Sequence, residues 1–301
     1  MMRVTQNRQN AIALQAVTSA RARLQNAQQQ AMSGERVTKP SDDPAAAARG
    51  RLLGELSARA ESHRTTVDYS TARLQTAESA LNEAGNVLTR ARELATSMAN
   101  GTMSAAERSS AATEIEQLRQ GMIDIANTRH GDEYVFANVA SRSPPYADGL
   151  GFTYDVDSFA DVRRAEVGPS QIAEIGASGS NAFAQRAADP GSVNVIAALA
   201  GLVTNLTNND PDAVRSDIDT VTRAFDQTLG ERTRVGVRLN QLNRADQAAE
   251  QSASVYSSLR SDLIDADAAE AFSRLTLAEN SMQAAVTVAA RVLGPSLLDT
   301  M

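Results

Sequence analysis

Residues 268–292 read AAEAFSRLTLAENSMQAAVTVAARV, and their spacing organises the rest of the chain. Apolar side chains recur at alternating steps of three and four residues, the pattern of a coiled-coil helix with a narrow apolar seam. The seam positions are Ala268, Ala271, Leu275, Ala278, Met282, Ala285, Ala289 and Val292. Phe272, Val286 and Leu293 are spaced by multiples of seven and are expected to widen the seam. Such a helix either docks on its own domain or needs another partner to cover its apolar edge.

The N-terminal arm follows the same rhythm, with seam positions Asn10, Ala13, Val17, Ala20, Leu24, Ala27 and Ala31. Residues 1–34 contain four arginines and no acid, whereas residues 262–301 contain six acids and two arginines. Opposite charge favours association, so we expect the two ends to pair with each other or with copies of each other. The predicted assembly seam comprises Val17, Leu24, Leu275, Met282, Val286, Val292 and Leu293.

The composition favours slender helical rods over a thick globular core. Of the 301 residues 42% are apolar, but only 4% are aromatic and none is Trp. The absence of Cys excludes disulfides and thiolate chemistry, and it leaves the compartment open. A net charge of −7 argues against nucleic acid as a partner. No apolar run is long enough to span a membrane, and residues 1–15 do not resemble a cleaved signal peptide.

Two long rods are predicted between the arms. The first is expected to begin at Pro44 and to keep its three-four spacing as far as Met98. The preceding turn and helix cap consist of Pro40, Ser41, Asp42, Asp43 and Pro44, with Asp43 or Ser41 available as the cap. Ser104 to Glu107 forms a capping box for a helix that can fold back antiparallel. The second rod follows Asp210-Pro211, and Arg232 and Asp246 on its seam indicate that it is only partly covered.

The composition between the rods is different, because turn residues and alternating patterns replace the heptads. Phe152 to Val156, Val162 to Val167 and Gln171 to Ile175 could form strands. The predicted fold is therefore mainly α, with long antiparallel helical rods and a small β-rich inserted domain. Terminal coiled-coil arms span residues 1–40 and 262–301, the rod domain spans 41–138 and 188–261, and the insertion spans 139–187. The Ala-rich arms bury little area, so we expect them to be disordered in the free monomer.

No catalytic, cofactor or metal motif is recognisable, and the sequence predicts a protein that is not an enzyme. Phosphate loops, nucleophile elbows and zinc-binding helices are missing. The two histidines, His63 and His130, lie in unlike contexts. Asp155, Asp157 and Asp161 have a spacing similar to a calcium loop, but the required Gly and the closing Glu are absent, which favours chance.

Several short motifs carry a family resemblance. They are Arg3-Val4-Thr5, Met32 to Val37, Lys39 to Pro44 followed by Ala45 to Arg49, Asn127 to Arg129 with Gly131 and Tyr134 to Ala137, and Arg291 to Leu293 with Ser296 to Asp299. Together they resemble the flagellin superfamily of bacteria, and more closely its hook-filament junction proteins, known as hook-associated protein 3. The resemblance covers roughly residues 3–138 and 190–301, and the insertion matches only loosely.

The resemblance implies a structural protein of the bacterial flagellum that joins hook to filament by self-assembly. It implies a ring of like subunits, neighbouring hook-associated protein and flagellin, and an outward-facing insertion. It also implies an extracellular location, reached by type III export without a cleaved signal, with an export chaperone on the C-terminal arm. Filament flagellin is the close alternative, but Gly34 to Val37 and Asp43-Pro44 depart from its pattern. A soluble coiled-coil signalling scaffold is a more distant alternative.

Overall fold

The structure, a computed structural model, describes residues 2–137, 142–146 and 162–293, and side chains from residue 8 to residue 292 within those ranges. The chain forms two compact units. One unit contains residues 1–59 and 251–301, and the other contains residues 60–250.

The described residues are mainly helical, as the sequence predicts. The helices are α1 (Met2–Ser33), α2 (Pro44–Met98), α3 (Ala105–Ala126), α4 (Gly179–Phe183), α5 (Val195–Thr207), α6 (Pro211–Ile264) and α7 (Ala268–Leu293). The strands are β1 (Arg129–His130), β2 (Glu133–Tyr134), β3 (Arg164–Gly168) and β4 (Gln171–Glu174). The limits predicted for the first rod, Pro44 and Met98, are confirmed.

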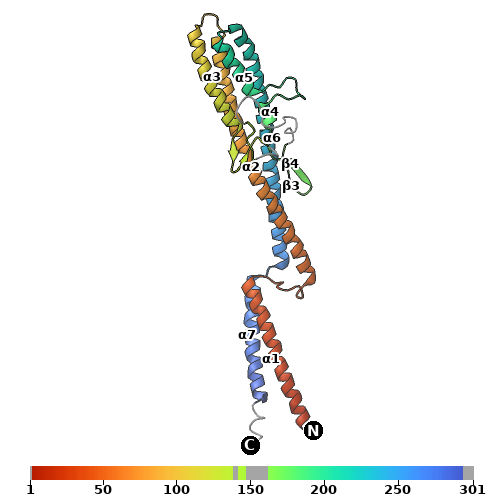
Figure 1. The fold of residues 1–301 in the computed structure, drawn as a ribbon. Coiled ribbons are helices and arrows are strands. Elements are labelled where there is room, and N and C mark those ends of the chain that lie inside the picture. Colours follow the sequence, from red (N-terminus) through yellow and green to blue (C-terminus); the bar gives the residue numbers. More distant parts are fainter. Residues whose placement is uncertain (1, 138–141, 147–161, 294–301) are drawn as a thin grey trace. The chain divides into compact units, whose positions relative to one another are not determined.

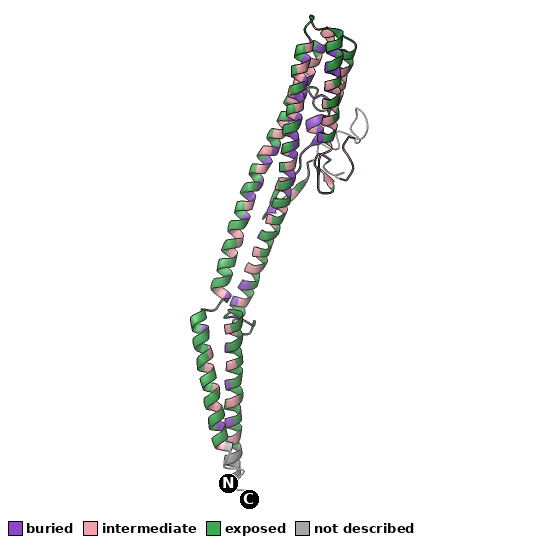
Figure 2. Cartoon of the chain, turned by 90° about the vertical axis from the view of Figure 1, so that its left-hand side faces the viewer, coloured by how far each residue is buried: buried purple, intermediate pink, exposed green. Residues whose placement is uncertain are grey.

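In the first unit, α1 and α7 run side by side (Figures 1 and 2). Glu35 and Asp265 form an antiparallel bridge just beyond the inner ends of the two helices, so α1 and α7 are antiparallel. Gly34 ends α1 with a φ of 70°, a left-handed conformation that glycine adopts without strain. The left-handed glycine therefore directly follows the last residue of α1, Ser33.

In the second unit, α2, α3, α5 and α6 pack as a bundle (Figure 1). The predicted seams of α2 and α6 supply its core, and α3 and α5 add their own apolar faces; fully buried members include Leu74, Leu88, Ile115, Leu199, Val221 and Leu242. Ser104 and Glu107 form the predicted capping box at the start of α3. Asp210 caps α6 by accepting hydrogen bonds from the N–H groups of Asp212 (3.1 Å) and Ala213 (3.0 Å).

The two charged residues on the α6 seam are paired across the bundle. Arg232 lies 2.7 Å from Glu78, and the Arg232 side chain keeps 38% of its surface exposed. Asp246 lies 3.3 Å from Arg64, and both of these side chains remain about 30% exposed. The expectation that the rod is only partly covered at these positions is therefore confirmed.

The described part of the insertion contains the two strands that the sequence predicts there, followed by a short helix. β3 and β4 form an antiparallel hairpin, which confirms two of the predicted strands. The predicted strand Phe152 to Val156, and the spacing of Asp155, Asp157 and Asp161, lie outside the described residues. The short helix α4 begins directly after Ser178, whose side chain accepts a hydrogen bond from Asn181 N–H and caps the helix.

A small hairpin made of β1 and β2 is a feature that the sequence did not predict. Gly131 provides its turn with a φ of 59°. Buried Arg73 of α2 fastens the hairpin, because its Nη2 donates to the carbonyl oxygens of Tyr134 (3.1 Å) and Val135 (3.2 Å). Burial lowers the pKa of Arg73, and the nearby charge of Arg163 adds to that effect.

Candidate assembly surface

The seam between α1 and α7 has the composition and spacing that the sequence predicts. Ala13, Ala20 and Ala27 are buried on α1, and Ala271 and Ala289 are buried on α7. The intervening predicted positions are half-buried: Asn10, Val17, Leu24 and Ala31 on α1, and Leu275, Ala278, Met282, Ala285 and Val292 on α7. Ala268 at the start of α7 is exposed. Small residues therefore alternate with larger ones along the contact, as they do in narrow coiled coils.

Two residues expected to widen this seam do not join it. Phe272 is 59% exposed and Val286 is 46% exposed. At about 100° per residue, both positions lie roughly a quarter turn away from the centre of the seam. The side chain of Leu293, the third such residue, lies outside the described side chains. Within the α1–α7 pair, the prediction that Phe272 and Val286 widen the seam is wrong, and their apolar surfaces remain uncovered.

These exposed side chains belong to two apolar faces of the arm pair. Residues equally far from the Glu35–Asp265 bridge lie at the same level of the two antiparallel helices. Leu14 and Val286 meet this condition, and so do Ile12 and Val288. The angular positions of the exposed residues around each helix then place one group on one side of the pair and the other group on the opposite side. We call these two groups the first face and the second face. The first face consists of Leu14, Met32, Phe272 and Val286, and the second consists of Ile12, Leu277 and Val288.

Figure 2 shows how little of the two arm helices is buried: exposed residues predominate on both. Both sides of the pair carry large apolar side chains in a part of the chain that has no thick core. Exposed apolar stripes of this kind mark surfaces that another protein covers.

The expectation that the two arms pair with each other is confirmed, but not on the basis of their charges. Among the described side chains, none of the arginines of α1 forms an ion pair with an acid of α7. Arg8, Arg21 and Arg23 are exposed. Arg23 Nε donates to the carbonyl of Ser19 in its own helix, and Glu270 of α7 pairs with Arg274 of the same helix. The opposite charges of the arms therefore stay available to a partner.

The joint at the inner ends of α1 and α7 is a compact network of backbone hydrogen bonds. Ala266 N–H donates to the carbonyl of Gly34 (2.8 Å), and Arg36 N–H donates to that of Ile264 (2.7 Å). Arg36 Nη2 also donates to the carbonyl of Leu263 at 2.7 Å. Ile264 packs with Val37 and Ala46 in a small separate core. The register of the two arms is thus set at this joint.

The predicted turn and cap lie beside the joint. Asp43 is the cap of α2, since its Oδ1 accepts a hydrogen bond from Ala46 N–H at 3.0 Å. That bond lowers the pKa of Asp43, and the charge of Arg36 adds to the effect. Asp42 closes the turn instead, accepting from Lys39 N–H at 2.9 Å. Pro40 and Ser41 lie within this exposed turn, and Pro44 is the first residue of α2.

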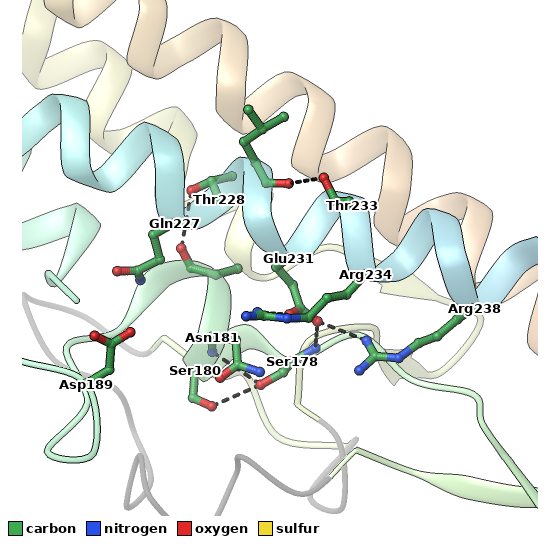
Figure 3. Close-up of polar contacts among 12 residues, drawn as sticks. Ser178, Ser180, Asn181, Asp189, Gln227, Thr228, Glu231, Thr233, Arg234 and Arg238 are labelled. Carbon is green, nitrogen blue, oxygen red and sulfur yellow. Dashed lines mark hydrogen bonds and ion pairs between the residues drawn. The ribbon is translucent and has the colours of Figure 1, made fainter. Parts of the chain in front are cut away.

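A second cluster of interest is the polar strip of α6 that faces the insertion (Figure 3). Glu231 is fully buried and accepts hydrogen bonds from Ser178 N–H (2.9 Å) and Arg238 Nη1 (3.1 Å). Arg234 pairs with the second carboxylate oxygen at 3.0 Å. Thr228 and Gln227 donate to carbonyl groups of the insertion, those of Ala182 and Ala184. Because its contacts are mostly with backbone atoms, this strip positions the insertion and offers no free reactive group.

The remaining chemistry of the described residues is sparse. Histidine, cysteine and acidic side chains form no group able to hold a metal ion within the described ranges. His130 contacts Thr76 and the edge of Tyr69. None of the described helices combines the length and apolar character needed to span a bilayer.

Comparison with known proteins identifies relatives for both the sequence and the fold. Residues 4–141 match the family described as the bacterial flagellin N-terminal helical region. The chain is 26% identical to flagellar hook-associated protein 3 of Escherichia coli over 94% of this chain and 95% of that protein. The flagellar filament 41 kDa core protein of Borreliella burgdorferi is 33% identical, but over only 43% of this chain and 39% of that protein.

The fold is shared with the crystal structure of flagellar hook-associated protein 3 from Legionella pneumophila. The TM-score is 0.62, with 15% sequence identity, and the match covers 71% of this chain and 98% of that one. The similarity to hook-associated protein 3 thus extends along the chain, whereas the similarity to the filament protein covers less than half. Over residues 4–141 the chain matches the flagellin N-terminal helical region, and along nearly its whole length it is a relative of flagellar hook-associated protein 3.

Proposed function

We propose that this protein joins hook to filament as a ring of like subunits whose paired terminal arms form the inner wall of the axial tube. The arm pair is the observation that carries the proposal. It has one seam covered within the chain and two further apolar faces that the chain leaves exposed. A helix pair that is apolar on two opposite sides is suited to a position between two neighbours.

The two faces differ in composition, and this difference favours a closed ring over a simple dimer. A two-fold dimer uses the same patch on both subunits, whereas a head-to-tail contact joins two different patches and closes only when its rotation permits. Phe272 and Met32 are found on the first face, and Leu277 occupies the second. We propose that the first face of one subunit packs against the second face of the next.

In the proposed ring, the predicted assembly seam therefore has two parts: contacts within one subunit and contacts between neighbouring subunits. Val17, Leu24, Leu275, Met282 and Val292 hold the two arms of one subunit together, and Val286 contacts a neighbour. Leu293 follows Val286 by seven residues in the sequence and so occupies the same heptad position. The exposed arginines of α1 and acids of α7 add charge complementarity between subunits or with the adjoining hook-associated protein and flagellin.

We also propose export through the flagellar type III channel without a cleaved signal, with a chaperone covering the C-terminal arm before assembly. Exposed Phe272, Leu277 and Val288 would otherwise present apolar surface in the cytoplasm. Pull-down of a flagellar chaperone by the full chain, and its loss when residues 268–301 are removed, tests this part. Binding that survives the truncation would contradict it.

Immunolabelling of purified flagella tests the location. A single band at the hook boundary is expected for a junction protein. Label along the whole shaft would mean that the protein is filament flagellin. Absence of label from the flagellum would favour the alternative of a soluble coiled-coil signalling scaffold.

A face-specific variant tests the arrangement of the ring. Val286→Asp puts a charge on an exposed apolar position, so we expect the monomer to fold normally while incorporation into flagella is lost. Asn280→Asp adds the same charge at an exposed polar position of α7 and serves as the matched control. Normal incorporation of Val286→Asp would contradict the assignment of the first face.

A further inference from the structure

The loop that joins α2 to α3 contains the one Asn-Gly pair in the sequence, Asn100-Gly101. Both residues are exposed, and a Cβ at residue 101 would meet nothing within 4 Å. An asparagine followed by glycine can cyclise, because the backbone nitrogen of the glycine can reach the side-chain amide without obstruction by a Cβ. What distinguishes this loop is the set of hydrogen bonds around the reacting groups.

The attacking group would be the backbone nitrogen of Gly101 after loss of its proton. Its N–H donates to no acceptor among the described residues, so the proton is accessible to solvent base. The negative charge left by deprotonation is shared with the carbonyl oxygen of Asn100. That oxygen accepts hydrogen bonds from the guanidinium Nη2 of Arg108 at 2.9 Å and from Met103 N–H at 3.2 Å. A charged donor stabilises such an anion strongly, which makes the Gly101 N–H more acidic.

Arg108 is held in place by contacts outside the reacting pair. It is only 3% exposed, its Nε donates to the carbonyl of Met98 at 3.0 Å, and its Nη1 donates to the side-chain oxygen of Asn209. The guanidinium therefore has little freedom to leave the Asn100 carbonyl. This preorganisation is absent from a free peptide of the same sequence.

The group under attack is polarised as well. Thr102 N–H donates to the side-chain oxygen Oδ1 of Asn100 at 3.2 Å. Attack on Cγ moves negative charge onto Oδ1, so this donor stabilises the tetrahedral intermediate in the way an oxyanion-hole donor does. The fold thus assists both the nucleophile and the electrophile.

We propose that Asn100 is a site of self-catalysed deamidation that the fold accelerates. The deprotonated Gly101 nitrogen forms a bond to Asn100 Cγ, the bond from Cγ to Nδ2 breaks, and the NH2 group takes one proton from solvent and leaves as ammonia. Water then opens the resulting five-membered imide at either carbonyl, giving aspartate or isoaspartate at position 100. No oxidant, reductant or cofactor takes part.

The products change the end of the bundle at which the loop lies. Aspartate adds a negative charge beside Arg108, and isoaspartate diverts the main chain through the former side chain and adds one backbone carbon. The second product displaces the backbone carbonyls that hold this corner, including the Ala99 carbonyl, to which Arg215 Nη2 donates at 3.3 Å. We expect the modification to accumulate with the age of the protein.

The test is the rate of deamidation at Asn100 in the folded full-length protein, compared with a synthetic peptide of residues 95–107, at pH 8 and 37 °C. Peptide mass spectrometry reads out both rates, and enzymatic methylation of isoaspartate identifies the product. Because the hydrogen bonds named above act only in the fold, we expect the folded protein to react about tenfold faster than the peptide. A folded rate equal to or below the peptide rate would overturn the proposal.

Two variants separate the contributions. Gly101→Ala is expected to fold normally, since the space is open and Gly101 does not have a positive φ, and to lose most of the reactivity. Arg108→Gln removes the charged donor, and its rate is expected to fall towards that of the peptide. Circular dichroism and thermal unfolding report whether Arg108→Gln remains folded. If it is folded and reacts as fast as the unaltered protein, Arg108 has no role and the mechanism is wrong.

Discussion

A Cβ on Gly50 would lie 2.7 Å from Cδ1 and Cγ1 of Ile264, so α2 and the end of α6 meet too closely for a Cβ unless the Ile264 side chain moves. Gly50→Ala forces Ile264 out of its small core, at a cost of about 1–3 kcal/mol. The gain in helix propensity of about 1 kcal/mol reduces the expected net loss to at most about 2 kcal/mol. We expect the midpoint of urea unfolding of the joint to fall.

Gly54, one turn further along α2, provides the matched control. A Cβ there would meet Arg260 Cδ at 3.9 Å, an ordinary contact. Gly54→Ala should therefore raise the midpoint through helix propensity alone. Equal shifts of the two variants in the same direction would refute the packing argument.

Replacing Glu231 should destabilise the second unit strongly. Its carboxylate is fully buried and joins Arg234, Arg238 and Ser178 N–H, and removal of one partner from a buried ion pair costs roughly 3–5 kcal/mol. Glu231→Ala is the variant, and chemical unfolding is the measurement. Glu116→Ala, which breaks an ion pair with Arg119 on the surface of α3, should cost under about 1 kcal/mol. A mild effect of Glu231→Ala would mean that the insertion is held mainly by other contacts.

Asp217 should make the second unit less stable as the pH rises. Burial raises the pKa of Asp217, and the hydrogen bond from Asn205 opposes the shift only in part. A carboxyl group with a raised pKa binds its proton more tightly in the folded state, so its stabilising contribution is present below the unfolded pKa near 4 and is lost as the pH rises through the folded pKa. Asp217→Asn should therefore stabilise the protein at pH 7, by less than about 1 kcal/mol, and have little effect below pH 4.

The measurement for Asp217 is thermal unfolding of both proteins across that pH range. Asp219→Asn removes the same charge at an exposed position two residues later and controls for net charge. A stabilisation by Asp217→Asn that persists unchanged at pH 3 would contradict the linkage.

The arms should exchange their amide hydrogens rapidly in the isolated monomer. The α1–α7 seam buries mainly alanine, and so little area does not offset the entropy of ordering two helices. Fast hydrogen exchange is expected for residues 1–35 and 265–301, with slow exchange around Leu74, Leu88 and Leu242 in the bundle core. Strong protection of both arms in the monomer would refute this prediction.

Charges placed in the seam should block assembly without unfolding the bundle. Leu275→Asp and Val17→Asp each put a carboxylate on a half-buried position between α1 and α7. We expect normal thermal unfolding of the second unit together with loss of incorporation into flagella. Normal filaments carrying either variant would contradict the role of the seam.

Periodicity predicted the helical part of this fold well, because heptad spacing is a local property of the sequence. The start of α2 follows from the preference of Pro44 for the first helical position, and its end at Met98 follows from the extent of the three-four spacing. The β1–β2 hairpin was missed because strands of two residues carry no alternation to detect. Its anchor, Arg73, is buried by a segment far away in sequence.

The candidate site was predicted less completely. The spacing predicts the seam positions but does not predict that Phe272 and Val286 are exposed. A residue at the edge of a seam is covered only if the facing helix carries side chains large enough to reach it. α1 offers mainly alanine there, so the contact stays narrow. In the same way, Glu231 reads as a solvated helix residue in the sequence, and it is buried only because the backbone of the insertion covers it. The Arg108 contacts at Asn100 also depend on the return of α3 beside α2.

The Glu35–Asp265 bridge makes the length of each arm as restrictive as its composition. The bridge fixes the register of the two helices, so every seam residue of α1 lies opposite a definite position of α7. Deleting one residue from either arm would turn all positions beyond it by about 100° and raise them by about 1.5 Å, which moves alanines out of the contact and exposes the larger seam residues. Insertions and deletions in the arms should therefore be tolerated only when they preserve the heptad phase.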